Sequence, residues 1–219
     1  MGERTGFLYP FLEHPSVEHP ADDPEALLAD LAWSAAAKWE ESGALRRAVC
    51  TANEDEVQAA AGAVAGRLAL GARVFAFGNG GSSADADAFV ARCRAIRPHP
   101  VPALSLCADP AVLTALANDI GSDVIFTRQL AAHARPGDVA AAFSTSGGSP
   151  NLLDAFAHCR RHGVLTIGFT GHDGPRLGPS VDHRFVVRAT SIHRIQEAQT
   201  ALATRLTAAI STAMAEGAP

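Results

Sequence analysis

The sequence has little of the positive charge on which nucleic-acid-binding proteins depend. Its 18 lysines and arginines are outnumbered by 23 aspartates and glutamates, and the formal net charge at pH 7 is −5. Such a chain presents no basic field to nucleic-acid phosphates, so we expect no nucleic-acid partner. Lys38 is the only lysine. It lies far from the two glycine-rich turns described below, which argues against Schiff-base catalysis and a Walker-type phosphate lysine.

Cysteines and long apolar runs are also scarce. The four cysteines form no C-x-x-C pair and no zinc-knuckle spacing; they are Cys50, Cys93, Cys107 and Cys159. Isolated cysteines favour a reduced, cytoplasmic setting. The sequence contains no run of about 18 apolar residues, and its start lacks a basic segment followed by an apolar one. We therefore expect neither membrane insertion nor export.

Most of the chain alternates between short apolar segments and helical ones. Strands are expected over residues 73–77, 102–106, 138–143, 165–169 and 184–187, with helices near 82–96, 109–117, 124–134, 149–161 and 191–214. Two more helices are expected over residues 23–41 and 53–70, before the first strand. Strands that are buried on both faces and followed by helices form parallel sheets covered by helices, so the pattern predicts an α/β fold.

Residues 1–24 differ from the rest, because they are rich in proline and acidic residues. We expect an extended arm there, which either docks on this subunit or a neighbouring one or stays disordered. Residues 25–216 are expected to form a single domain that includes the N-terminal helices.

A glycine-rich turn, GNGGS, follows the first expected strand. Gly78, Gly80 and Gly81 would let the backbone approach a ligand closely, and Asn79 and Ser82 could hydrogen-bond a sugar hydroxyl or a phosphate. The spacing fits neither G-x-G-x-x-G nor G-x-x-x-x-G-K-[ST], which argues against dinucleotides and nucleoside triphosphates.

A second turn, STSGGSP, follows the third expected strand. Ser144, Thr145, Ser146 and Ser149 could surround a phosphate with hydroxyls, and Ser149 followed by Pro150 is typical of a helix N-cap. Both turns lead into helices, whose unpaired N–H groups and positive dipole ends would face the space above the sheet. Together the turns predict a site for one phosphorylated metabolite.

The chain resembles the SIS (sugar isomerase) family, and within it the sedoheptulose 7-phosphate isomerase (phosphoheptose isomerase) group. The resemblance rests on GNGGSSADA, LTALANDIGSDVIFTRQ, STSGGSPNLLDA, TIGFTGHDG and RIQEAQ, which occur in the family's order between about residues 40 and 215. It implies a Rossmann-like three-layer αβα sandwich with a five-stranded parallel sheet. It also implies a homo-oligomer, a tetramer or a dimer, with sites at subunit contacts and a phosphorylated sugar as ligand.

The resemblance extends to the site residues. The serine loop would hold the phosphate, while Asn79, Ser82 and Asp119 would face the sugar; Asp119 could instead be a surface or capping carboxylate. The substrate- and phosphate-binding candidates are Asn79, Gly80, Ser82, Arg92, Asp119, Ser144, Thr145, Ser146, Ser149 and Gln196.

Four positions depart from the family pattern. Family isomerases usually carry a histidine and a glutamate one helical turn apart after the first turn, then a glutamine and a histidine near the start of the last helix, and they often bind zinc there. This chain has Ala88, Arg92, Gln196 and Gln199 at these positions. Glutamine neither titrates nor favours zinc, so we expect no metal cofactor and no certain catalytic residue.

Other residues could take over the proton transfer. His193 and Glu197 at the start of the last helix are the candidates, although a histidine there can equally be a surface or cap residue. Arg92 would suit a second anionic group on the ligand. Alternatively, it fills the vacated space and pairs with Asp85, Asp87 or a neighbouring subunit.

Three hypotheses follow for the function. The first is a phosphosugar-binding protein with a degenerate catalytic and metal site, which serves as a sensor, a scaffold or the partner subunit of another protein. The alternative is an active aldose–ketose phosphate isomerase that uses His193, Glu197 or Asp119 as substitute proton carriers. The third is a nucleotide-binding Rossmann-like domain, against which the turn sequences argue.

Overall fold

The computed structural model describes residues 24–172, 177 and 181–217. The arm expected over residues 1–24 therefore lies almost entirely outside the described residues, and the domain expected over residues 25–216 stays a prediction. Contacts between Cα atoms divide the chain after Glu41. None of the helices in the described part is long and apolar enough to cross a membrane.

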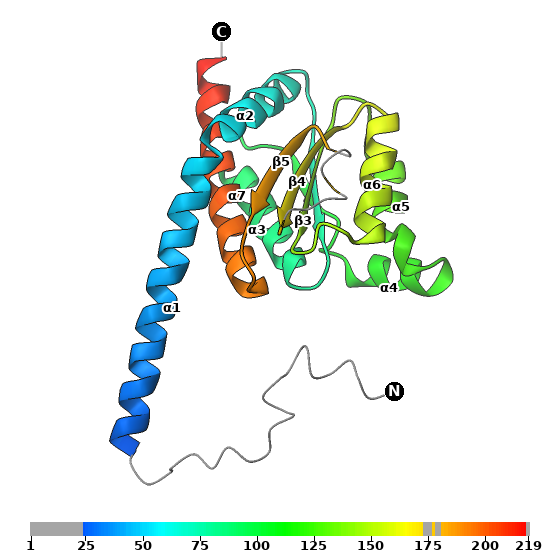
Figure 1. The fold of residues 1–219 in the computed structure, drawn as a ribbon. Helices are drawn as coiled ribbons and strands as arrows, with labels where there is room; N and C mark the ends of the chain where they lie inside the picture. The colour runs from blue at the N-terminus through cyan, green and yellow to red at the C-terminus, as the bar shows by residue number, and fades with distance from the viewer. Residues whose placement is uncertain (1–23, 173–176, 178–180, 218–219) are drawn as a thin grey trace. The chain divides into compact units, whose positions relative to one another are not determined.

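Five parallel strands form one sheet in the order β2-β1-β3-β4-β5 (Figure 1). The strands are β1 (Val74–Gly78), β2 (Ala103–Ser105), β3 (Val139–Ser144), β4 (Leu165–Gly171) and β5 (His183–Val187). Every residue of β1, β3 and β4 is buried, as expected for inner strands covered on both faces. The predicted α/β fold with five parallel strands is confirmed.

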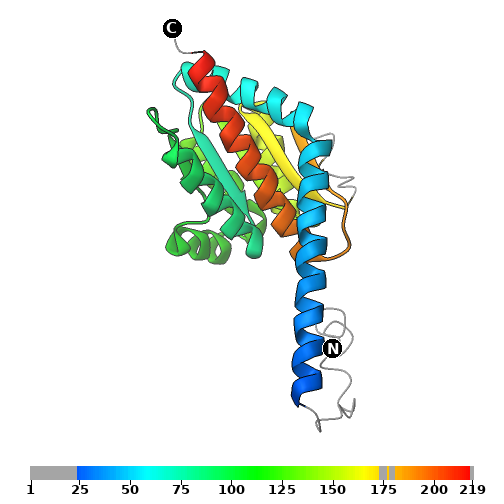
Figure 2. The same cartoon turned by 90° about the vertical axis from the view of Figure 1, so that its left-hand side faces the viewer.

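Helices cover both faces of the sheet. The helices α2 (Glu54–Ala69), α3 (Gly81–Ala95) and α7 (Ile192–Glu216) enclose one apolar cluster, and α5 (Ile125–His133) and α6 (Pro150–Arg161) enclose the other. Figure 2 shows α7 lying along its face of the sheet. Between β2 and α5 lie α4 (Pro110–Asp119) and a 3-10 helix, η2 (Ser122–Val124). The predicted three-layer sandwich is therefore present.

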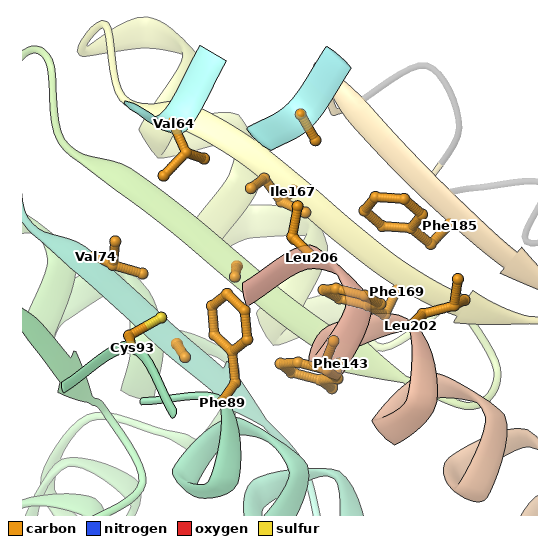
Figure 3. Packing of buried hydrophobic residues seen from close by; sticks show 14 of the residues in the cluster. Val64, Val74, Phe89, Cys93, Phe143, Ile167, Phe169, Phe185, Leu202 and Leu206 are labelled. Atoms are coloured by element: carbon orange, nitrogen blue, oxygen red, sulfur yellow. The ribbon is translucent and has the colours of Figure 1, made fainter. Parts of the chain in front are cut away.

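The core between the sheet and α7 is built around aromatic rings. Phe143 stacks on Phe169 with a ring-centroid distance of 4.4 Å, and Phe169 stacks on Phe185 at 4.9 Å. Figure 3 shows these rings from three adjacent strands, with Leu202 and Leu206 of α7 packed against them. Replacing a buried phenylalanine by alanine in such a core costs about 3–5 kcal/mol, so these rings fix the position of α7 on the sheet.

The first helix is longer than predicted. We expected it to end at residue 41, but α1 runs from Pro24 to Ala52. Its last turns carry Leu45 and Val49, which pack on the apolar cluster, and this burial continues the helix past Gly43. Asn53 occupies the N-cap position of α2 without a side-chain capping bond, and α2 lies over most of the predicted segment. In the part of α1 before position 42, Trp33 and Trp39 are each 75% exposed.

Candidate functional site

The order of the strands places a topological switch point between the carboxyl ends of β1 and β3. In a sheet of order 2-1-3-4-5 the connections leave β1 and β3 toward opposite faces, and ligands bind at this switch point. The two glycine-rich turns begin at these strand ends, because Gly78 closes β1 and Ser144 closes β3. The fold therefore brings together the two segments that the sequence predicted as one site.

A pair of amides joins the two turns. The Asn79 Nδ2 donates to Asn151 Oδ1 at 2.9 Å, and the Asn151 Nδ2 donates back to Asn79 Oδ1 at 3.0 Å. Asn151 is buried near the start of α6, whereas Asn79 is exposed. Each amide keeps a second N–H and further acceptor capacity. Asn79 can therefore hold the second turn and still offer hydrogen bonds to a ligand.

The first turn requires glycine for steric reasons. A Cβ on Gly78 would lie 2.6 Å from the carbonyl oxygen of Ser82, and one on Gly81 would lie 2.3 Å from the Gln196 Nε2. Gly80 has φ of +56°, in the left-handed region that favours glycine. Ser82 is buried, and its backbone N–H donates to the Asn79 carbonyl at 3.1 Å. The predicted candidates Asn79, Gly80 and Ser82 therefore form one tight turn at the base of α3.

The second turn is shaped by its own hydroxyls. The Gly147 N–H donates to Ser144 Oγ at 3.0 Å, and the Gly148 N–H donates to Ser146 Oγ at 3.3 Å. Ser144 is buried and Ser146 is exposed. These bonds use acceptor capacity of the two oxygens and leave their O–H groups free to donate to an anion. Such hydroxyls can bind a phosphate without any lysine.

The serine loop continues into α6 through the N-cap that the sequence predicted. Ser149 is the N-cap residue and Pro150 occupies the first helical turn. The Ser149 side chain makes no capping bond to the helix, so its hydroxyl is not used by the helix backbone. Thr145 is half-buried, and its carbonyl would lie 2.2 Å from a Cβ on Gly171 at the end of β4. The loop is therefore packed closely against a third strand end.

The start of α7 contacts both glycine-rich turns. The Gln199 side chain is fully buried, and its Nε2 donates to the Ser144 carbonyl at 2.9 Å. The Gln196 amide lies against Gly81 at the base of α3. Gln199 thus holds the serine loop, and Gln196 contacts the first turn. Gln196 lies beside the first turn, and its role in ligand binding stays a prediction.

Three of the candidate residues, Glu197, His193 and Asp119, lie in surroundings that are less favourable for proton transfer. The Glu197 carboxylate accepts a hydrogen bond of 2.5 Å from Ser42 Oγ and pairs with Arg194. The Ser42 hydroxyl, followed by Arg194, lowers the pKa of Glu197, which makes it a weak base. His193 is exposed in the first turn of α7. Asp119 is exposed at the end of α4, where Asn118 donates to its carboxylate at 2.9 Å.

Arg92 lies on α3, and its ion-pair partners expected from the sequence are not observed. Within the described ranges it makes no ion pair with Asp85 or Asp87. Burial raises the pKa of Asp85, and the Thr200 hydroxyl and then the Arg92 charge oppose this rise. Asp85 instead accepts a 2.6 Å hydrogen bond from Thr200 Oγ1 on α7. This places a carboxyl, a hydroxyl and a guanidinium near the seam between α3 and α7.

The residues at the expected metal positions do not suit zinc. Ala88 has no donor atom, Arg92 carries a positive charge, and Gln196 and Gln199 offer only amide oxygens. In the part of the chain that the structure describes, no three His, Cys, Asp or Glu side chains are grouped to hold a metal ion. We derive no chemical step through a metal.

A thiolate is also a poor candidate for the base. Cys107 lies nearest to the first turn, where its Sγ donates to the Gly78 carbonyl at 3.3 Å. Burial raises the pKa of this thiol, and it raises the pKa of Cys93 and of Cys159 to about 12. These thiols therefore stay protonated near neutral pH.

With this geometry in view, the chain was compared with known proteins. The model of the family described as "SIS domain" matches residues 39–171. The chain belongs to the SIS-domain family. Two curated SIS relatives are phosphoheptose isomerases, from Solidesulfovibrio magneticus (41% identical, covering 72% of this chain and 78% of the relative) and Aquifex aeolicus (38%, covering 72% and 84%).

A solved SIS structure agrees with the fold over most of its length. The phosphoheptose isomerase from Neisseria gonorrhoeae superposes with a TM-score of 0.78 at 30% identity, covering 83% of this chain and 99% of the other. The resemblance to the SIS family and to its phosphoheptose isomerase group is therefore confirmed. This chain is a phosphoheptose isomerase-like SIS-domain protein.

Sequence reasoning missed two residues of the site. Asn151 follows Pro150 in the serine loop motif, and its position near a helix N-terminus beside a buried loop was the available signal. Asp85 was considered only as a partner for Arg92. Its pairing with Thr200 joins residues 115 positions apart, which a local pattern does not reveal.

Proposed function

We propose that this SIS-domain protein is an aldose–ketose isomerase of a phosphorylated sugar. The substrate that we favour is sedoheptulose 7-phosphate, which would be converted to D-glycero-D-manno-heptose 7-phosphate or a related aldose. The observation that carries the proposal is the convergence of both glycine-rich turns at the switch point between β1 and β3, joined by Asn79 and Asn151.

The serine loop supports the phosphate-binding half of the proposal. Ser144, Thr145, Ser146 and Ser149 surround a loop that leads into the N-terminus of α6, whose backbone donors and dipole favour an anion. The sugar would extend toward the first turn, where Asn79 and the Gln196 amide offer neutral hydrogen-bonding groups. Neutral donors of this kind suit hydroxyls and a carbonyl oxygen.

The comparisons favour turnover over binding alone. The relatives reported above are named phosphoheptose isomerases, and they cover most of this chain. The departures at Ala88 and Arg92 had favoured a non-catalytic sensor, scaffold or partner subunit. Because the isomerase relatives match well beyond the two turns, we place the isomerase hypothesis ahead of that interpretation. If the chain is an isomerase, the residues at positions 88 and 92 mean that another side chain carries the proton.

The direct test is an NMR assay of the purified protein with sedoheptulose 7-phosphate. We expect the aldose phosphate to form in a time-dependent manner, at a rate that does not change when EDTA or zinc is added. A thermal-shift screen provides the matched binding experiment, in which phosphosugars raise the Tm and NAD or ATP do not. Ligand stabilisation without any aldose would favour the non-catalytic phosphosugar-binding protein. Stabilisation by nucleotides alone would contradict both hypotheses.

We further propose a cytoplasmic homo-oligomer, a tetramer or a dimer, as the working form. The exposed apolar side chains of α1, among them Trp33 and Trp39, are typical of surfaces that pack against another copy. Light scattering of the full chain measures the mass directly, and a monomer at micromolar concentration would contradict the proposal.

A further inference from the structure

One face of α3 carries four residues in a single stripe. Gly81, Asp85, Ala88 and Arg92 follow the spacing i, i+4, i+7 and i+11, which places them on the same side of a helix. Two of them contact α7, because Gly81 touches the Gln196 amide and Asp85 accepts the Thr200 hydroxyl. The stripe therefore starts at the first glycine-rich turn and follows the seam between the two helices.

Asp85 carries the carboxyl group of this stripe, and only one of its two oxygens has a hydrogen-bond partner in the described part of the chain. Its Oδ1 accepts the hydroxyl of Thr200 at 2.6 Å. Its Oδ2 is buried and has no hydrogen-bond partner within the described part of the chain. Buried carboxylate oxygens are normally hydrogen-bonded, and an unsatisfied one costs free energy. If Asp85 served only to join α3 to α7, a second hydrogen-bond partner would stabilise it further. We therefore take the unsatisfied oxygen as a sign that the carboxyl has a role besides joining the two helices.

The surroundings of Asp85 suit reversible proton transfer. Burial raises the pKa of the carboxyl, while the Thr200 hydroxyl and the Arg92 charge lower it. Among the elements packed against α3, the strands β1, β2 and β3 contain no charged residue. The helix α7 carries His193, Arg194, Glu197 and Arg205, but its residues that contact Gly81 and Asp85 are the neutral Gln196 and Thr200. Arg92 is thus the charged group that opposes the effect of burial. A desolvated carboxylate is also a stronger base than an exposed one.

The other candidates lack this combination. Glu197 is engaged by Ser42 and Arg194, which lower its pKa. Asp119 and His193 are exposed to water. Ala88 carries no titratable group.

Resting on the isomerase function proposed above, we infer that Asp85 is the residue that moves the proton between C1 and C2 of the sugar phosphate. The Asp85 carboxylate removes the proton from C1 of the ketose. The C1–H electron pair then forms the C1=C2 bond, and the C2 carbonyl π pair moves to O2, which takes up a proton from water. In the second half the C1=C2 π pair takes the proton from Asp85 to form the C2–H bond, O1 gives its proton to water, and the O1–H electron pair forms C1=O. The atoms and electrons balance without an oxidant or reductant.

The test compares Asp85→Asn with a matched control, Asp87→Asn. Asp87 is an exposed carboxylate two residues later on the same helix and outside the stripe. We expect Asp85→Asn to lower kcat for sedoheptulose 7-phosphate by about 10²–10⁴-fold, the usual contribution of a general base. The phosphosugar-induced rise in Tm should persist, and deuterium incorporation at C2 in D₂O should be lost. Asp87→Asn should stay within about twofold of the wild-type kcat, as expected for an exposed carboxylate outside the site.

A second variant, Thr200→Val, keeps the carboxyl and removes the hydroxyl that favours its ionised form. The pKa of Asp85 then rises, so the acidic limb of the kcat profile should move to higher pH. This shift decides the question if Asp85→Asn does not fold. An unmoved acidic limb would overturn the inference, and so would an Asp85→Asn enzyme within about threefold of wild type, since a general base contributes far more. Both results leave the proposed function standing, whereas a wild-type protein without turnover overturns both.

Discussion

Asn79 and Asn151 exchange two side-chain hydrogen bonds between the first glycine-rich turn and the start of α6, at 2.9 and 3.0 Å. This pair fixes the distance between the two turns that we assign to one ligand. Replacing either residue by alanine should destabilise the protein by about 1–2 kcal/mol, because the remaining amide loses its partner. The double variant should cost clearly less than the sum of the two, and both single variants should weaken phosphosugar binding. Urea unfolding and thermal shifts measure the two effects, and additive losses would show that the amides act independently.

The serine loop can be tested by adding a negative charge. Ser146 is exposed in the loop, so Ser146→Asp should fold normally and repel the phosphate. We expect the phosphosugar-induced rise in Tm to disappear. Ser122→Asp, at an exposed site in η2, is the control and should keep the rise. An unaltered ligand response in Ser146→Asp would remove Ser146 from the phosphate site.

Gln199 offers a way to separate binding from stability. Its Nε2 holds the Ser144 carbonyl, while its own Oε1 is buried without a partner in the described part of the chain. Gln199→Leu removes an unsatisfied oxygen, which favours the folded state, and leaves the Ser144 carbonyl without this donor, which disfavours it. Because the two effects oppose each other, the free energy of unfolding should change by less than about 1 kcal/mol. Phosphosugar affinity should fall, because Ser144 is no longer held. Gln58→Leu, at an exposed position of α2, should change neither quantity.

The Ser42–Glu197 contact predicts a pH-dependent stability. The Ser42 hydrogen bond lowers the pKa of Glu197 in the folded state. A lowered carboxyl pKa contributes stability that is present above the unfolded-state value and is lost as pH falls through the folded-state value. Ser42→Ala should therefore cost at most about 1 kcal/mol near neutral pH, since solvent screens the partly exposed carboxylate. The difference should shrink near about pH 3. An equal loss at both pH values in urea unfolding would assign the effect to packing instead.

Much of the fold could be predicted because its signals are local. The glycines of GNGGS and the Ser149–Pro150 cap mark strand ends and helix starts, and the structure places them there. The end of the first helix could not be predicted in this way. Leu45 and Val49 of α1, which runs to Ala52, pack on an apolar cluster whose other buried members come later in the chain, and a local pattern does not contain that burial.

For the candidate site, the sequence indicated the ligand-binding chemistry that we propose, and the tertiary structure determined which of these groups lie together. The turns, their hydroxyls and the replacement of the expected histidine and glutamate by Ala88 and Arg92 are properties of the residue order. The amide pair of Asn79 with Asn151 and the contact of Asp85 with Thr200 depend on how the helices pack over the sheet. Packing also removes water from Asp85 and thereby raises its pKa, which no list of residues reveals, because desolvation is set by neighbours distant in the chain.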